Sequence, residues 1–295
     1  MAATDAGVEL PAAIEKAPGY WSGVFRRFSR DPVAVTCAVI VLLLILAAIF
    51  APYLGLNDPY KASMIKRLKP IGYDGFPLGT DEQGRDMLAR LIYGGRLTLF
   101  VGLMPVVFAF FIGSFLGLVA GYAGGWINTV IMRTVDVFFA FPSVLLAIAI
   151  SSALGAGMIN SLVSLTIVFI PSICRVAESA TASVRSLDYI EAARATGGNV
   201  LTILRVHVIG NVLGPIFVYA TSLTSVCMIL AAGLSFLGIG VKPPEPEWGL
   251  MLNTLRTAIY INPWVAALPG AMIFITSLCL NLLSDGLRSA MNVKD

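Results

Sequence analysis

The sequence predicts an all-α membrane protein with about six transmembrane helices. Of its 295 residues, 57% are hydrophobic and only 13% are charged, and the mean hydropathy is +0.85. Ordinary globular domains carry about 25% charged residues, so we expect membrane lipid to cover most of this chain. Its apolar residues form runs close to the roughly 20 residues that a helix needs to cross a bilayer. The six runs are 33–50, 97–120, 137–155, 159–176, 212–233 and 264–283.

The first apolar run follows a basic flank that includes Arg26, Arg27 and Arg30. As a helix, residues 33–50 rise roughly 27 Å, which is enough to span the hydrocarbon core. A cleaved signal peptide has a shorter apolar core of about 7–15 residues and a small-residue cleavage site. We therefore interpret 33–50 as a retained first transmembrane helix, preceded by a cytoplasmic segment, 1–32.

Helix parity and the N-terminal flank fix the predicted orientation. With residues 1–32 inside, the loop 51–95 lies outside, while segment 185–210 and the tail 286–295 lie inside. Lys and Arg are then divided 11 inside and nine outside, so the positive-inside rule is a weak guide by itself. Residues 96–285 form the predicted core with the other five spans.

Three features of the spans and loops suggest how the helices contact their surroundings. The spacing of Gly113, Gly117 and Gly121 lets another helix approach closely, either within the subunit or between subunits. The run from Met87 to Ile92 suggests an amphipathic helix along the outer face. Trp248, after a proline-rich stretch, resembles an aromatic anchor at the membrane interface; the stretch itself fits either a partner contact or a structural hairpin.

The polar segment 185–210 begins with a predicted short helix. Asp188 followed by Glu191 is typical of a capping box, and Ala192 and Ala193 are strong helix formers with little bulk. Such a helix presents a smooth face that fits a groove on a soluble partner. Alternatively, Glu191 only complements the helix dipole.

A glycine corner and a second short helix follow. The Gly197-Gly198 pair permits positive φ and a sharp exit, although Gly197 also fits an ordinary C-cap. Asn199 then caps a second helix over 200–208. Two short helices at a sharp angle form a V-shaped element that can transmit a push as a rigid body.

Glu191, Ala192, Ala193 and Gly197 resemble the Glu-Ala-Ala docking loop of ABC importer permeases, although the family's Ile-Leu-Pro-like close is Val208-Ile209-Gly210 here. Further passages resemble the C-type permease subunit of the dipeptide, oligopeptide and nickel family. These passages are 76–86, 120–126, 235–244 and 281–288. The likeness runs from about residue 20 to 292, and the order and spacing of the motifs make it specific.

The resemblance implies the type I ABC importer permease fold in a bacterial inner membrane, spanned several times. It implies a homologous second permease, two cytoplasmic ABC ATPase subunits or domains docked on 185–210, and a periplasmic or lipid-anchored substrate-binding protein. The implied cargo is di- or oligopeptides, with nickel complexes, glutathione or opines as alternatives. These 295 residues contain no Walker Gly-x4-Gly-Lys-Ser/Thr motif, so no cofactor is expected in this chain; ATP and Mg²⁺ belong to the partner ATPases. The chain itself is expected to be non-catalytic.

Polar residues within the spans suggest further roles. Ser222, Thr224 and Ser225 are candidates for lining the pathway, unless their hydroxyls bond back to their own helix. Asp136 is a functional candidate because it is an intramembrane acid, but an intrahelical pair with Arg133 explains it better. The same spacing predicts a pair at the inner end of the last span, between residues 285 and 288.

Other function classes have less support. A net charge of +3 without an aromatic-rich basic stretch does not indicate nucleic-acid binding. The four cysteines, Cys37, Cys174, Cys227 and Cys279, are spread over separate apolar runs and indicate packing instead of a metal site. A secondary transporter using Asp136 would predict paired broken helices and an internal repeat, which we do not find. A membrane scaffold that recruits a soluble partner through its polar loop is the remaining alternative.

Overall fold

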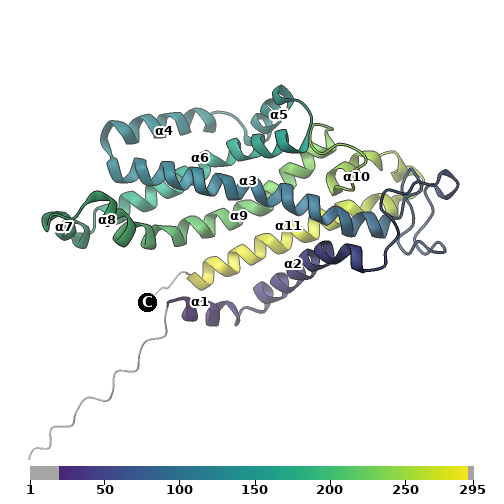
Figure 1. Ribbon diagram of the computed structural model, residues 1–295, viewed down its shortest axis with the longest axis horizontal. Coiled ribbons are helices and arrows are strands. Elements are labelled where there is room, and N and C mark those ends of the chain that lie inside the picture. Colours follow the sequence, from purple (N-terminus) through teal and green to yellow (C-terminus); the bar gives the residue numbers. More distant parts are fainter. Residues whose placement is uncertain (1–19, 292–295) are drawn as a thin grey trace, which may run out of the picture.

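The computed structural model describes residues 20–291, which fold into a bundle of helices (Figure 1). Within that range, the only β-type pairings are two isolated bridges, between Tyr73 and Phe76 and between Thr80 and Asp86. The α-helices are α1 (Tyr20–Phe28), α2 (Pro32–Phe50), α3 (Met87–Ala123), α4 (Gly125–Phe139), α5 (Ser143–Leu154), α6 (Met158–Arg185), α7 (Asp188–Ala195), α8 (Val200–Ile203), α9 (Ile209–Phe236), α10 (Trp248–Thr254) and α11 (Pro263–Met291). A π-helical turn, η3 (Leu204–Val208), joins α8 to α9, and the short 3₁₀ turns are η1 (Ala51–Tyr53), η2 (Met64–Lys66) and η4 (Ala258–Tyr260).

Five segments of the described chain are long and apolar enough to cross a membrane. They are α2 with η1, α3, α6, the stretch from α8 through α9, and α11. The count rises to six if α4 and α5, which meet at 90°, form one broken span. The all-α prediction with about six spans is therefore confirmed.

The third span differs most from the prediction. Hydropathy placed it at 137–155, but α4 starts at Gly125 and ends at Phe139, and α5 starts only at Ser143. Pro142 explains the break, because a proline disfavours helical geometry at the residue before it. Pro142 itself has ψ 127° and precedes the first residue of α5.

The second span is longer than predicted. Residues 87–92 do not form a separate amphipathic helix on the surface, since α3 runs unbroken for 37 residues, about 56 Å. Met87 and Leu91 are buried in an apolar cluster with Trp248. The surface-helix prediction is wrong because these apolar side chains meet protein and not lipid.

The glycine stripe of α3 packs against α6 within the subunit. A Cβ atom at Gly117 would lie 2.4 Å from the Cys174 carbonyl oxygen, and one at Gly121 would lie 2.7 Å from the Glu178 carbonyl oxygen. No larger residue fits at such distances, so the glycines allow the two backbones to touch.

The two ends of the bundle are built differently (Figure 1). At one end, called the hairpin end, lie α7 and α8 together with α1 and the last turns of α11. At the other, called the cap end, lie residues 51–86 and 237–262. The described N-terminal helix, the 188–208 hairpin and the end of α11 thus share one side, as helix parity predicts.

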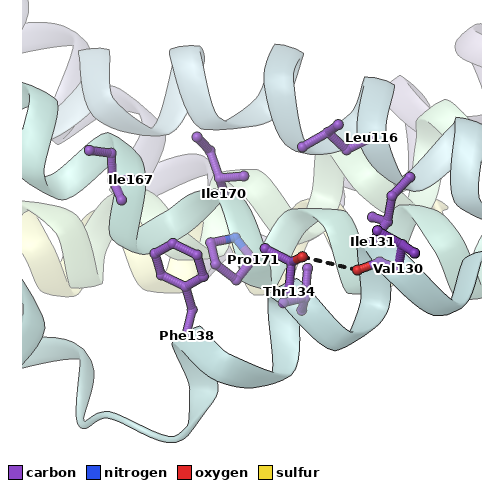
Figure 2. A pocket seen from close by; sticks show the side chains of 9 residues that line it. Leu116, Val130, Ile131, Thr134, Phe138, Ile167, Ile170 and Pro171 are labelled. Atoms are coloured by element: carbon purple, nitrogen blue, oxygen red, sulfur yellow. Dashed lines mark hydrogen bonds between the residues drawn. The ribbon is translucent and has the colours of Figure 1, made fainter. Parts of the chain in front are cut away.

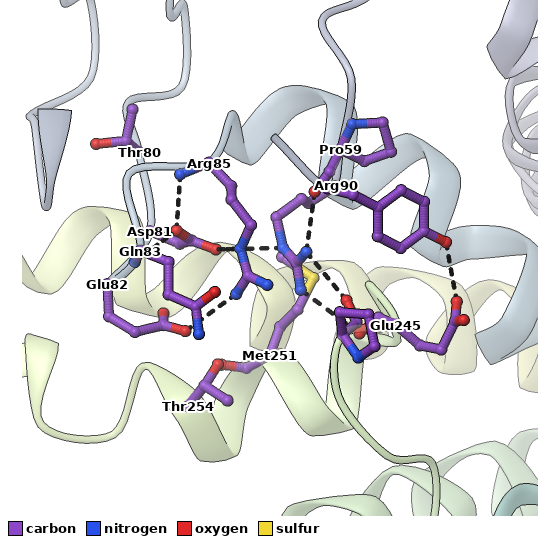
Figure 3. A network of polar contacts seen from close by, with 12 residues as sticks. Pro59, Thr80, Asp81, Glu82, Gln83, Arg85, Arg90, Glu245, Met251 and Thr254 are labelled. Atoms are coloured by element: carbon purple, nitrogen blue, oxygen red, sulfur yellow. Dashed lines mark hydrogen bonds and ion pairs between the residues drawn. The ribbon is translucent and has the colours of Figure 1, made fainter. Parts of the chain in front are cut away.

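The cap end is held by buried polar contacts. Asp81 accepts a 2.6 Å hydrogen bond from Arg85 Nε and forms a 3.3 Å ion pair with Arg90 Nε, and all three side chains are almost fully buried (Figure 3). Trp248 is only 1% exposed and donates its indole N–H to the Leu91 carbonyl at 2.8 Å. The predicted interface anchor is therefore a core residue, because its one polar atom finds a partner inside the protein.

Candidate functional site

The hairpin of residues 188–208 (α7, α8 and η3) carries the four residues predicted to dock a partner. α6 ends at Arg185, and α7 follows after a two-residue link. Glu191, Ala192 and Gly197 are exposed, and Ala193 is half-buried. The structure thus gathers all four on one short helix and its exit.

The start of α7 is not a capping box. Leu187 occupies the N-cap position with no side-chain hydrogen bond, while Asp188 and Glu191 lie in the first turn. Carboxylates there interact favourably with the helix dipole. The alternative interpretation of Glu191 as a dipole partner therefore fits the geometry, and its exposed carboxylate remains free to meet another protein.

The exit of α7 has the geometry of a Schellman motif. Gly197 has φ +80° and its N–H donates to the Arg194 carbonyl at 3.0 Å, while the Gly198 N–H donates to the Ala193 carbonyl at 3.1 Å. This pair of bonds with a left-handed glycine ends a helix sharply. Asn199 Oδ1 then accepts the Leu201 N–H at 3.2 Å, which confirms the predicted cap of the second helix.

Two isoleucines fasten the hairpin to the bundle. Ile190 and Ile203 are 0% and 2% exposed and belong to the main apolar core, together with Val208 and Val212. Each buried side chain of this size contributes roughly 1.5–3 kcal/mol. The hairpin is therefore anchored to the spans that flank it.

Polar and aromatic contacts fix the hairpin's angle. The Arg194 guanidinium lies 5.2 Å from the centre of the Tyr122 ring at the end of α3. The Tyr189 hydroxyl accepts a 3.1 Å hydrogen bond from the Asn211 side chain on α9. These contacts connect α7 to both α3 and α9.

The outward face of the hairpin is partly apolar. Leu201 is 72% exposed and Val206 62% exposed, at an end of the bundle that also carries Arg194 and Arg205. Exposed apolar side chains beside polar ones mark protein contact surfaces. The sequence predicted the second short helix over 200–208 but not that Leu201 and Val206 would be exposed on it.

The three hydroxyl-bearing residues of α9 that were predicted to line the pathway lie mostly inside the subunit. Thr224 and Ser225 are buried, and their hydroxyls donate to the carbonyls of Ala220 at 3.4 Å and Ser222 at 3.0 Å. Ser222 is half-buried and donates to the Tyr219 carbonyl at 2.7 Å. All three hydroxyls therefore bond back to their own helix. A role in lining the pathway stays a prediction, and Ser222 fits it best because it is the least buried of the three.

The intramembrane acid has a partner that the sequence did not reveal. Asp136 contacts Arg175 on α6, and its expected partner Arg133 lies farther away, at 3.8 Å. Asp285 and Arg288 form no ion pair within 4 Å in the described chain, so that prediction is wrong. The four cysteines are buried and unpaired, and no metal-binding group of side chains occurs within residues 20–291.

A bundle of helices long and apolar enough to cross a membrane, with an anchored hairpin at one end, has the form of a membrane permease subunit. The chain belongs to the family described as binding-protein-dependent transport system inner membrane component, whose model matches residues 113–293. Residues 19–70 match the N-terminal transmembrane domain of oligopeptide transport permease C. It is therefore a multi-pass inner-membrane permease that works with other transporter subunits.

Similar proteins cover nearly the whole chain. The glutathione transport system permease protein GsiD of Pectobacterium atrosepticum is 43% identical over 93% of this chain and 91% of its own length. The di/tripeptide transport system permease protein DppC of Pseudomonas aeruginosa is 38% identical over 99% and 96%. The dipeptide transport system permease protein DppC of Alkalihalophilus pseudofirmus is 39% identical over 93% and 90%.

Solved structures confirm the fold. A chain of the inward-facing MetNI methionine ABC transporter matches with a TM-score of 0.57 at 20% identity, covering 70% of this chain and 98% of that one. A chain of an amino acid ABC transporter matches with a TM-score of 0.52 at 17% identity, covering 67% and 92%. The bundle therefore has the type I importer permease fold.

Proposed function

We propose that this chain is the non-catalytic transmembrane subunit of an ATP-driven importer that moves di- or oligopeptides across the inner membrane. The observation that carries the proposal is the 188–208 hairpin, which exposes Glu191 and Ala192 while Ile190 and Ile203 are buried in the core. The cargo class is supported by relatives whose names specify dipeptides, tripeptides and glutathione, which is itself a short peptide.

The proposed complex contains a second, homologous permease and two ABC ATPase subunits or domains that bind ATP and Mg²⁺. The ATPases dock on the hairpin end, which is cytoplasmic in this arrangement, through Glu191, Ala192, Ala193 and Gly197. A periplasmic or lipid-anchored binding protein delivers the peptide to the cap end.

The hairpin geometry suggests how ATP binding moves the spans. Closure of the ATPases pushes α7, and the buried Ile190 and the Arg194–Tyr122 contact pass the displacement to α6 and α3. Because the Schellman exit and the Asn199 cap fix the angle between the two short helices, the hairpin moves as one body. Alternating access follows if this motion opens one end of the pathway as it closes the other.

The test uses the complete transporter in proteoliposomes. Glu191→Lys should abolish ATP-dependent uptake of a labelled dipeptide while the chain still inserts and retains the second permease. Asp188→Lys is the matched control, because it makes the same charge change in the same helical turn and loses the same dipole interaction. An equal loss of uptake with both variants would show that Glu191 acts only through the helix dipole. Normal uptake with Glu191→Lys would overturn the docking role.

A further inference from the structure

A charged group lies between α4 and α6, away from the hairpin. Asp136 contacts Arg175 on α6, and Arg133 Nη1 on α4 lies 3.8 Å from the same carboxylate. The Arg175 guanidinium also lies 4.6 Å from the centre of the Phe139 ring. Two guanidiniums and one carboxylate leave an excess of one positive charge.

These side chains lie well away from the ends of their helices. Arg175 precedes the end of α6 at Arg185 by ten residues, about 15 Å along the helix. Arg133 follows the start of α4 at Gly125 by eight residues, about 12 Å. The group lies near the inner boundary of the spans, however, because Arg175 is the last residue but one of the apolar run 159–176.

The charged group is nevertheless exposed on this subunit. The Arg133 side chain is 80% exposed, and those of Asp136 and Arg175 are 46% and 47% exposed. Arginine side chains near the end of a span reach the water interface, and charges within the membrane face a water-filled cavity or protein. We therefore expect water to reach this group in the working transporter.

The other face of α4 has a different character. Behind it lies a cavity of about 290 Å³, lined by apolar side chains that include Ile131, Phe138 and Ile170 (Figure 2). The Thr134 hydroxyl donates to the Val130 carbonyl of its own helix at 3.0 Å, so it offers no free donor there. The charged side chains of α4 thus lie on the Arg133–Asp136 side, while its Asn128 side chain donates to Glu178 on α6 at 2.6 Å.

We infer that Arg133 and Arg175 line the translocation pathway and bind the carboxylate end of a short peptide, with Asp136 as a positioning residue. This inference rests on the proposed importer function. A guanidinium offers five N–H donors in a planar fork that matches a carboxylate. Arg175 donates to Asp136, while Arg133 donates to no described residue, so most of these donors are available to cargo.

The first experiment measures water access and charge in the assembled transporter. Ser179 is exposed on α6, one turn beyond Arg175, and Ser179→Cys leaves the three charged residues in place. Labelling rates are compared for an anionic sulfonatoethyl and a cationic trimethylammonium-ethyl methanethiosulfonate reagent. The introduced thiol should react, with a ratio of anionic to cationic rates that falls when Arg175→Gln is added and rises when Asp136→Asn is added.

Two controls accompany the labelling. The parent chain without the Ser179→Cys substitution gives the background, since its four cysteines are buried. Leu43→Cys tests an exposed apolar position of α2, where a charged reagent should react slowly. If the Ser179→Cys thiol reacts in the isolated chain but not in the complex, the second permease covers the charges and the inference is overturned. An unchanged rate ratio after Arg175→Gln also overturns it.

A second experiment separates cargo binding from a structural role. Uptake of trialanine and of its C-terminal amide is measured with the complete transporter, each normalised to the affinity of the binding protein for that peptide. Arg175→Gln should reduce uptake of the free acid more than uptake of the amide, and Arg175→Lys should retain part of the preference. Equal reduction of both peptides overturns the cargo contact, whereas absence of any ATP-dependent uptake by the unmodified transporter would contradict the proposed function instead.

Discussion

The two ends of the bundle use polar residues in opposite ways. At the cap end, Asp81, Arg85 and Arg90 are almost fully buried, and the Asp81 carboxylate pairs with both arginines. At the hairpin end, Glu191 and Arg194 are exposed, and two buried isoleucines provide the attachment. Removing one partner of a buried ion pair strongly destabilises the protein, whereas removing one partner of an exposed pair changes its stability little. The cap end is therefore built to hold its shape, whereas the hairpin end presents its charged side chains to the outside.

The largest expected effect is at the cap end. Asp81→Ala leaves the buried Arg90 guanidinium without its carboxylate partner and Arg85 with Glu82 alone, and should cost roughly 3–5 kcal/mol. Folded protein recovered from membranes, measured by size-exclusion chromatography in mild detergent, should fall sharply. Asp74→Ala, which removes an exposed acid of the same region, should give a normal yield. Equal yields from both variants would show that the buried network does not stabilise the cap end.

A somewhat smaller effect is expected between the two ends, where α3 packs on α6. Gly117→Leu places a side chain where a Cβ alone would lie 2.4 Å from the Cys174 carbonyl oxygen, and overpacking typically costs about 1–3 kcal/mol or more. Thermal unfolding of the purified chain should shift to lower temperature. Gly233→Leu on α9, where a Cβ atom would have no neighbour within 4 Å, should unfold at nearly the normal temperature. If the Gly117 variant unfolds normally too, the close α3–α6 contact is not required.

At the hairpin end, a milder substitution should affect function more than stability. Gly197→Ala meets no atom within 4 Å, so its cost arises only from the positive φ of +80° and amounts to about 1–2 kcal/mol. Uptake should fall while thermal unfolding of the bundle hardly changes. Gly210→Ala, also in open space but with ordinary helical φ, should leave uptake unchanged. A large loss of global stability in Gly197→Ala would contradict the contrast between the ends.

Local signals in the sequence were sufficient for the exit of α7 and the cap of α8, and insufficient for much of the rest. The positive φ of Gly197 and the cap at Asn199 follow from residue chemistry within a few positions, and both are observed. The partner of Asp136 is 39 residues away on another helix, and no spacing rule reaches that far. Burial of Trp248 depends on the Leu91 carbonyl, 157 residues earlier.

Charged residues also concealed the true start of the second span. Arg90 and Arg96 lower the hydropathy of residues 87–96, so the apolar run read from the sequence begins only at 97. In the structure Arg96 Nη2 donates to the Ile49 carbonyl at 2.7 Å, and Arg90 pairs with Asp81. A helix can contain such charges when the fold supplies partners for them, and hydropathy cannot detect those partners.

The smallest expected effect concerns the protonation of Glu82 at the cap end. Burial, and then the neighbouring Asp81 carboxylate, raise the pKa of Glu82 above its usual value, although Arg85 opposes the shift. One of its carboxylate oxygens is buried without a hydrogen-bond partner. A carboxyl group with a raised pKa binds its proton more tightly in the folded state, so stability rises as pH falls through that raised pKa and is lost again as pH increases. The unfolding temperature should therefore rise slightly as the pH is lowered from neutral to just above the usual glutamate range, and Glu82→Gln should lose this dependence. An identical pH dependence in both proteins would assign the effect to another group and show that even the least satisfied carboxylate of the cap end is tolerated in its charged form.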